Sequence, residues 1–346
     1  MLFCADGKSG LPGVKKEWPL CKDLIMHAND SDLYLDHERY PVKTARWPWL
    51  LLAISLWVGW AQPVAAKLVT EIIQVPVTVR NGYDKEITRE VVVTVFHEDS
   101  TPQPRPILII GHGRAADPVA RAKAGRMTYI TNARWFAQMG FLVAVPTRIG
   151  YGVTGGEDAE DTGDCSRKNY PPGYTAAAVQ TLKVLDVLRQ RPDVHPDRTI
   201  VMGQSFGGAM AITVAAQNPP GVQAAINFAG GGGGNPTTKP QDPCAAWALE
   251  RMFAGYGKTA RIPTLWVYTE NDQWMGPKHP RAWFEAYKAQ GGVGAFVLFP
   301  PHGKDGHGLF TTAPEVWRTT VFEFLQANGY PDLKMPVINS EPAQQP

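Results

Sequence analysis

The chain has 346 residues, with 34 lysine and arginine residues against 32 aspartate and glutamate residues, so its formal net charge is only +2. A charge this close to balance provides no basic surface for nucleic acid, and we expect no nucleic-acid partner. Its 34 glycines and 30 prolines predict many turns, without the three-residue period of collagen or the shortage of apolar residues that marks a disordered chain.

An apolar run near the N-terminus predicts export. Residues 47–61 (WPWLLLAISLWVGWA) carry no charged side chain. This run is short for a membrane span, which needs about 20 apolar residues, and it fits the h-region of a signal peptide. Lys43 and Arg46 supply the positive n-region, and residues 64–66 (VAA) supply small side chains for cleavage. We therefore predict a signal peptide at 42–66.

Residues 1–41 precede this signal and show no sustained strand or helix periodicity. Because an export signal normally begins the chain, we interpret them as a leader that is disordered or never translated, with the true start at Met26 or near Val42. Cleavage after Ala66 then leaves a periplasmic or secreted protein with no stable membrane span.

The chain after the signal opens with strand patterns. Two β-branched, alternating stretches, 71–80 and 88–97, are joined by a turn at Asn81-Gly82 and predict an antiparallel hairpin. Short and almost wholly apolar runs follow, which are typical of strands buried on both faces of a parallel sheet. These runs are 106–110, 141–145, 199–202, 223–228, 263–268 and 295–299.

Helical patterns lie between and after these runs, and the first of them ends at Gly140, a predicted C′ glycine. The alternation predicts the α/β class: a mostly parallel central sheet with an antiparallel N-terminal hairpin and helices on both faces. We expect one domain over 67–330 and a flexible tail at 331–346. The predicted helices are 130–139, 174–190, 206–217, 280–290 and 314–327.

The segment GQSFG at 203–207 has the pattern G-x-S-x-G. A predicted strand precedes it and a helix rich in small residues follows, which is the setting of a nucleophile elbow. In such an elbow a sharp turn exposes the serine Oγ, and Gly203 and Gly207 let the strand and the helix approach each other. We predict Ser205 as the nucleophile and the N–H of Phe206 as one donor to an oxyanion. The alternative is an ordinary glycine-rich turn.

A serine hydroxyl needs an adjacent base, and after an elbow of this kind an acid and then a histidine follow in chain order. The run 263–268 leads into TENDQW, where Asp272 is the predicted acid. Glu270 is the main alternative and Asp305 a weaker one. Trp274 either lines the pocket or packs as an ordinary aromatic side chain.

The loop after the last predicted strand offers two histidines. His307 precedes the final helix and has a glycine on each side, which permits a tight loop, so we predict it as the base. His302 is the alternative and is otherwise a loop or pocket-rim residue.

A second oxyanion donor is expected in the loop after the run 106–110, where GHGR follows at 111–114. Glycine lets the backbone approach a substrate closely. The predicted donor is the N–H of Gly113 or of Arg114. His112 lies too early in the chain to be the base, and we interpret it as structural.

These motifs together resemble the α/β-hydrolase superfamily, and within it the dienelactone-hydrolase and prolyl-oligopeptidase-like group of exported serine esterases. The resemblance spans nearly all of 70–328. It is carried by GHG at 111–113, GQSFGG at 203–208, YTENDQW at 268–274 and DGHGLF at 305–310.

The resemblance implies a serine hydrolase that cleaves small-molecule carboxylic esters through an acyl-enzyme. Ser205 would attack, His307 would transfer protons and Asp272 would orient the histidine. Dienelactone hydrolases carry a cysteine where this chain has serine, so dienelactone is not the expected substrate. Prolyl oligopeptidases carry a large propeller for which the mature chain has no room, so we favour esters. The alternatives are a peptidase or amidase with the same triad and a non-catalytic binding protein on this fold.

The remaining motifs concern metals, cysteines and glycines. The mature chain has no H-x-x-x-H or H-E-x-x-H pair, so we expect no metal site and no cofactor. Cys4 and Cys21 precede the cleavage point, which leaves Cys165 and Cys244 as a candidate disulfide in an oxidising compartment. Free buried thiols are the alternative. Five glycines at 230–234 suggest a flexible loop near the pocket mouth.

The export prediction is tested by N-terminal sequencing of the protein recovered outside the cytoplasm. We expect its first residue to be Lys67, because cleavage follows Ala66. A mature protein that retains Met1 would contradict the prediction.

Overall fold

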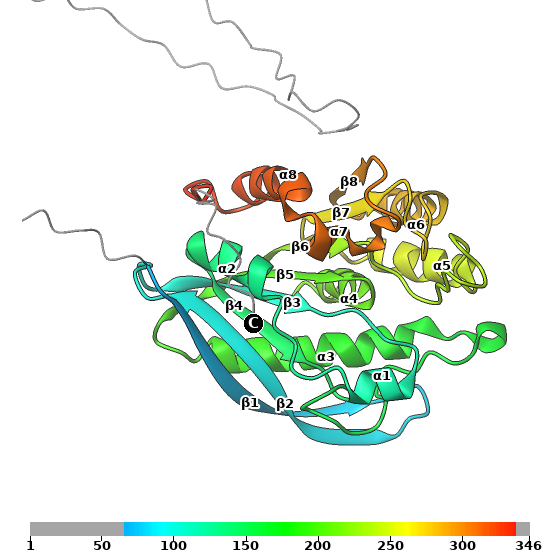
Figure 1. Cartoon of the computed structure of the whole chain (residues 1–346), viewed down its shortest axis with the longest axis horizontal. Coiled ribbons are helices and arrows are strands. Elements are labelled where there is room, and N and C mark those ends of the chain that lie inside the picture. The colour runs from blue at the N-terminus through cyan, green and yellow to red at the C-terminus, as the bar shows by residue number, and fades with distance from the viewer. Residues whose placement is uncertain (1–65, 337–346) are drawn as a thin grey trace, which may run out of the picture. The chain divides into compact units, whose positions relative to one another are not determined.

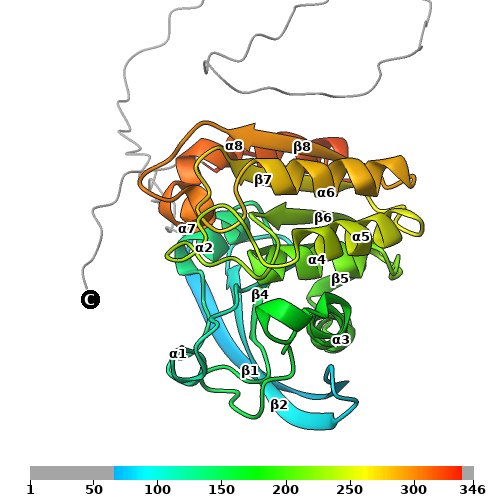
Figure 2. The ribbon, with the colours of Figure 1, turned by 90° about the vertical axis from the view of Figure 1, so that its right-hand side faces the viewer.

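The computed structural model describes residues 66–336, which form one mixed β-sheet covered by helices on both faces (Figures 1 and 2). The predicted leader, all of the predicted signal peptide except Ala66, and residues 337–346 lie outside the described residues.

The sheet has eight strands in the order β1-β2-β4-β3-β5-β6-β7-β8. β1 pairs antiparallel with β2, and β2 pairs antiparallel with β4, whereas every later pair is parallel. This confirms the predicted fold class. The strands are β1 (Leu68–Arg80), β2 (Glu86–Glu98), β3 (Arg105–Gly111), β4 (Leu142–Thr147), β5 (Val194–Gln204), β6 (Val222–Phe228), β7 (Thr264–Thr269) and β8 (Gly294–Phe299).

The five predicted helices are present, and further helical segments lie between them. None of the helices within residues 66–336 is long and apolar enough to cross a membrane. The helices are α1 (Pro118–Ala122), α2 (Ile130–Gln138), α3 (Tyr170–Leu188), α4 (Phe206–Ala215), α5 (Ala246–Gly257), α6 (Lys278–Ala289), α7 (Leu309–Thr312) and α8 (Pro314–Ala327), with 3₁₀ turns η1 (Cys165–Arg167) and η2 (Gly306–Gly308).

Local start and stop signals explain where the predicted and observed helices differ. α3 begins four residues earlier than predicted, because Pro171 and Pro172 lie in its first turn, where proline needs no helical N–H partner. α5 was not predicted: the residue before it is Ala245, in a left-handed conformation at φ 49°, with no side-chain cap. Gly140 has φ 97°, as expected of a glycine just past a helix.

Two apolar cores lie on the two faces of the sheet. Successive side chains of a strand point to opposite faces. In β3, Ile107 and Ile109 pack into the core shared with α3, α4, α5 and α6, whereas Leu108 and Ile110 pack into the core shared with α2, α7 and α8. Figure 2 shows α3 to α6 on one face. Burial on both faces therefore explains the continuous apolar runs of the parallel strands.

A disulfide joins two segments that are far apart in the sequence. Cys165 in η1 is bonded to Cys244, which lies just before α5, across 79 residues of chain. The hydroxyl of Tyr170, at the start of α3, donates to the carbonyl oxygens of Gly232 and Cys244. The disulfide thus ties the segment before α3 to the segment that connects β6 to α5.

Removing this disulfide is expected to destabilise the fold, because closing a long loop restricts the unfolded chain. For a chain starting at Lys67, Cys165→Ser with Cys244→Ser is predicted to lower the free energy of unfolding by about 2–4 kcal/mol in guanidinium titrations. The wild type should lose a similar amount when reductant is added. Equal unfolding midpoints for the variant, the wild type and the reduced wild type would contradict the prediction.

Candidate active site

The candidate nucleophile sits in a strained turn between β5 and α4. Ser205 has φ 57° and ψ −121°, a backbone conformation that costs a residue other than glycine about 1–3 kcal/mol. The surrounding backbone holds it there: the N–H of Ser205 donates to the carbonyl of Phe228 at 2.8 Å, and its own carbonyl accepts from the N–H of Gly208 at 2.9 Å. Strain maintained in this way is typical of functional sites.

Two glycines make the sharp turn possible. A Cβ atom at Gly203 would lie 2.4 Å from the carbonyl carbon and oxygen of Gly207, and a Cβ at Gly207 would lie 2.2 Å from the carbonyl oxygen of Gly111. Such approaches are too close for any side chain. The end of β3, the end of β5 and the start of α4 therefore meet backbone to backbone at the candidate site.

Asp272 and His307 are hydrogen-bonded to each other. Asp272 follows β7 and is fully buried, and His307 lies in η2, after β8. The Nδ1 atom of His307 is 3.0 and 3.1 Å from the two carboxylate oxygens. Because a carboxylate only accepts, Nδ1 carries a proton and Nε2 is left with a free lone pair when the ring is neutral.

Backbone contacts fix both side chains in place. Asp272 Oδ1 accepts from the N–H groups of Trp274 at 2.8 Å and Met275 at 2.9 Å. The side-chain amide of Gln204, the residue just before Ser205, donates to the carbonyl of His307 at 3.1 Å. This last bond attaches the loop that carries the histidine to the strand that carries the serine.

The alternative acids and the alternative histidine have other contacts. Glu270 is exposed, and its N–H donates to the last residue of β8. Asp305 Oδ1 accepts from the N–H of His307 and of Gln273, both at 2.9 Å, so it joins the two loops through their backbones. His302 exchanges backbone hydrogen bonds with the side chain of Asn271. Within the described residues, only Asp272 is bonded to the His307 ring.

The loop after β3 lies against the serine. A Cβ atom at Gly113 would be 3.4 Å from Ser205 Cβ and 3.9 Å from Ser205 Oγ, so glycine lets this backbone come close. Phe206 is the first residue of α4, and the first N–H groups of a helix have no partner within it. Backbone donors from two segments therefore lie near Ser205.

His112 holds one side of this loop. Its Nε2 accepts from the N–H of Arg148 at 3.1 Å, so Nδ1 carries the proton and donates to the carbonyl of Gly113 at 2.7 Å. Burial lowers the pKa of His112 well below its usual range, and the nearby charge of Arg148 acts in the same direction. The ring is therefore neutral near pH 7. As expected, its role is structural rather than that of a base.

A buried ion pair supports the same loop, and sequence reasoning missed it. Arg148 follows β4 and donates to Glu160 at 2.5 Å; both side chains are buried. A second nitrogen of Arg148 donates to the carbonyl of His112 at 2.7 Å. Close by, Arg114 forms two bonds to Asp158 at 2.8 and 2.5 Å. Asp158 and Glu160 lie in a long loop whose sequence has no strand or helix periodicity, so no sequence signal indicated these ion pairs.

The glycine run at 230–234 is packed rather than open, which corrects the prediction of a flexible loop. A Cβ at Gly232 would lie 2.7 Å from the hydroxyl of Tyr174, and a Cβ at Gly234 would lie 2.7 Å from the carbonyl oxygen of Trp274. Gly230 and Gly231 are buried. Glycine is needed at these positions because neighbouring aromatic side chains and backbone atoms fill the space that a side chain would occupy.

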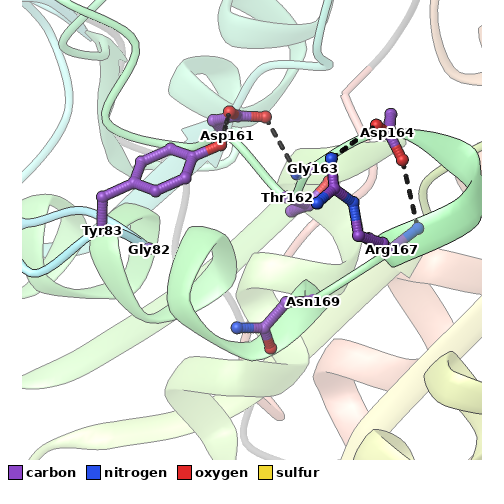
Figure 3. A pocket seen from close by; sticks show the side chains of 8 residues that line it. All are labelled: Gly82, Tyr83, Asp161, Thr162, Gly163, Asp164, Arg167 and Asn169. Atoms are coloured by element: carbon purple, nitrogen blue, oxygen red, sulfur yellow. Dashed lines mark hydrogen bonds and ion pairs between the residues drawn. The ribbon is translucent and has the colours of Figure 1, made fainter.

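A surface pocket lies elsewhere, between the β1–β2 turn and the segment before α3 (Figure 3). It contains none of the predicted catalytic residues. Its carboxylates already have partners: Asp161 accepts from the hydroxyl of Tyr83 at 2.7 Å, and Asp164 caps η1. The pocket is lined by Gly82, Tyr83, Asp161, Thr162, Gly163, Asp164, Arg167 and Asn169. Residues 66–336 contain no cluster of three or more histidine, cysteine, aspartate or glutamate side chains that could hold a metal ion.

Comparison with protein families finds one similarity over part of the chain. A family model described as the dienelactone hydrolase family matches residues 124–279. Over these residues the chain is similar to the dienelactone hydrolase family. The matched segment includes Ser205 and Asp272 and ends before His307. This match confirms the resemblance that the sequence motifs indicated.

Solved structures that are similar to this chain are named for different activities. One is an acetyl xylan esterase from Paenibacillus sp. R4, with a TM-score of 0.50 and 17% identity over 77% of this chain and 90% of that chain. A dienelactone hydrolase-like promiscuous phosphotriesterase from metagenomic libraries has a TM-score of 0.45 and 15% identity over 75% and 99%. An acylaminoacyl peptidase from Pyrococcus horikoshii has a TM-score of 0.49 and 15% identity over 78% and 43%. Identities this low concern the fold alone. No curated protein sequence matches the chain.

The buried pair of Arg148 and Glu160 gives a stability prediction. Arg148→Met leaves a carboxylate buried without its partner, so we expect a loss of about 3–5 kcal/mol in unfolding free energy. Adding Glu160→Met removes that charge, and the double variant should recover part of the loss. Chemical denaturation of both variants measures this. A single variant as stable as wild type, or a double variant less stable than the single one, would contradict the assignment.

Proposed function

We propose that this protein is a serine hydrolase that cleaves carboxylic esters through an acyl-enzyme intermediate. The observation that carries the proposal is the hydrogen bond between buried Asp272 and the His307 ring. Gln204 joins this pair to the strained turn that presents Ser205. The proposed nucleophile, base and orienting acid thus belong to segments that follow β5, β8 and β7, which supports the proposal.

The first step is attack on the substrate carbonyl. Ser205 Oγ attacks the acyl carbon while His307 Nε2 takes its proton, and the alcohol leaves with that proton. Asp272 keeps Nδ1 protonated, so Nε2 is the nitrogen available as a base. In the second step, water activated by the same nitrogen attacks the acyl-enzyme and releases the acid. Each step transfers one proton through His307, and the second step restores the free enzyme.

The oxyanion formed in each step needs backbone donors. Phe206 supplies one N–H from the start of α4. For the second we assign Arg114 rather than Gly113. The carbonyl of Gly113 is held by His112 Nδ1, and in a trans peptide the next N–H points the opposite way.

Export fits this proposal. The disulfide between Cys165 and Cys244 is the kind of bond that persists in an oxidising compartment. We therefore propose a periplasmic or secreted enzyme that acts on small-molecule esters. Esters are favoured over amides because an ester carbonyl is more reactive than an amide carbonyl, and an alkoxide is a better leaving group than an amide anion. A peptidase or amidase that uses the same three residues is the second candidate function.

Replacing the nucleophile tests the proposal. Ser205→Ala is expected to lower kcat for p-nitrophenyl esters by several orders of magnitude, because no acyl-enzyme can form. Its circular dichroism spectrum should match that of wild type. A fluorophosphonate should label the wild type at Ser205 and leave the variant unlabelled. Turnover of esters of several chain lengths, with a p-nitroanilide measured in parallel, separates esterase from amidase.

Matched controls keep this test specific. Glu270→Gln and His302→Gln change the alternative acid and histidine, and both should leave kcat close to that of wild type. Retained activity in Ser205→Ala would refute the proposal. Labelling of Ser205 without turnover of any ester or anilide would instead favour a binding protein on this fold.

A further inference from the structure

Trp274 covers one face of the His307 ring. The two ring centroids are 5.3 Å apart and the planes are inclined by only 26°, which is a stacked arrangement. Trp274 lies two residues after Asp272, and its ring is half-buried. Trp274 therefore contacts the face of the ring, whereas Asp272 is hydrogen-bonded to its edge at Nδ1.

The backbone around Trp274 is specifically shaped to hold the ring there. Its N–H donates to Asp272 Oδ1 at 2.8 Å, so the stacked residue and the acid are fixed together. A Cβ at Gly234 would lie 2.7 Å from the carbonyl oxygen of Trp274 and 3.0 Å from its Cβ. Gly233 accepts a backbone bond from disulfide-bonded Cys244 at 3.0 Å. Trp274 thus packs against Gly234, whose neighbour Gly233 is tethered to the disulfide-bonded segment.

We propose that Trp274 is a positioning residue that holds the His307 ring and stabilises it while it carries the proton taken from Ser205. The proposal rests on the proposed function, since it assigns His307 the role of base. It also explains the glycine at 234, since a side chain there would take the space of Trp274 beside the acid.

The physical reason is the charge distribution of the indole ring. The face of an aromatic ring is negative and attracts a cation lying over it, and tryptophan does so most strongly. His307 is cationic only after it has taken a proton, that is, in the transition states and the tetrahedral intermediates. The interaction is therefore stronger there than in the ground state, and its loss should lower kcat and leave KM almost unchanged.

Two substitutions at this position distinguish the effect of the aromatic face from the effect of side-chain volume. Trp274→Leu keeps an apolar side chain but has no π-face, and we expect kcat for p-nitrophenyl acetate to fall about 5- to 30-fold, the factor expected of one partly desolvated cation–π contact. KM should stay within about twofold. Trp274→Phe restores an aromatic face and should recover most of the activity. The rate of fluorophosphonate labelling should fall and recover in parallel, because that reaction also needs the base.

Of two further variants, the first is a control and the second is an additional test. Trp247→Leu changes a tryptophan on α5 that is 68% exposed, and it should leave kcat unchanged. Gly234→Ala introduces the Cβ that would displace Trp274, and it should lower kcat as Trp274→Leu does. Thermal unfolding of every variant shows whether it is folded at the assay temperature, and rates are compared only among folded variants.

The outcomes are distinguishable. Wild-type kcat in Trp274→Leu, an equal loss in Trp274→Phe and Trp274→Leu, or a rise in KM alone would each overturn the role of Trp274. If Ser205→Ala is inactive while Trp274→Leu is fully active, the proposed function stands and only this inference fails. If Ser205→Ala is active, the proposed function itself fails.

Discussion

The candidate site depends on one constraint, the strained backbone of Ser205. A residue other than glycine with φ 57° persists only when its surroundings enforce the conformation. Here the enforcement is steric as well as hydrogen-bonded: Gly203, Gly207 and Gly111 bring three backbone segments so close that no side chain fits between them. The strain presents Ser205 at the sheet edge where the other elements of the site converge.

Two separate networks meet at this turn. On one side Asp272, His307 and Trp274 contact one another, and they are fixed by backbone hydrogen bonds and by packing of Trp274 against Gly234. On the other side Arg148, anchored by buried Glu160, holds the carbonyl groups of the loop after β3 and so orients its N–H groups. The proposed proton transfer and the proposed oxyanion stabilisation therefore depend on different side chains.

The sheet and the order of the candidate residues could be predicted because they follow from local patterns. Strands buried on both faces are continuously apolar, and Asp272 and His307 each follow such a strand, so they end at the same edge and are hydrogen-bonded. The Arg148–Glu160 pair could not be predicted, because charged residues in a loop without periodicity are ordinarily expected to be exposed to solvent. The glycine run was misinterpreted, because glycine appears equally where a loop moves and where another side chain needs its space.

The most direct test of this account is to trap the acyl-enzyme. Wild-type protein is mixed with p-nitrophenyl acetate, quenched with acid during turnover, and analysed by intact mass and peptide mapping. The account predicts an added mass of one acetyl group on the peptide that contains Ser205, and no such adduct in Ser205→Ala. Rapid product formation with no adduct, or an adduct on a different residue, would contradict it.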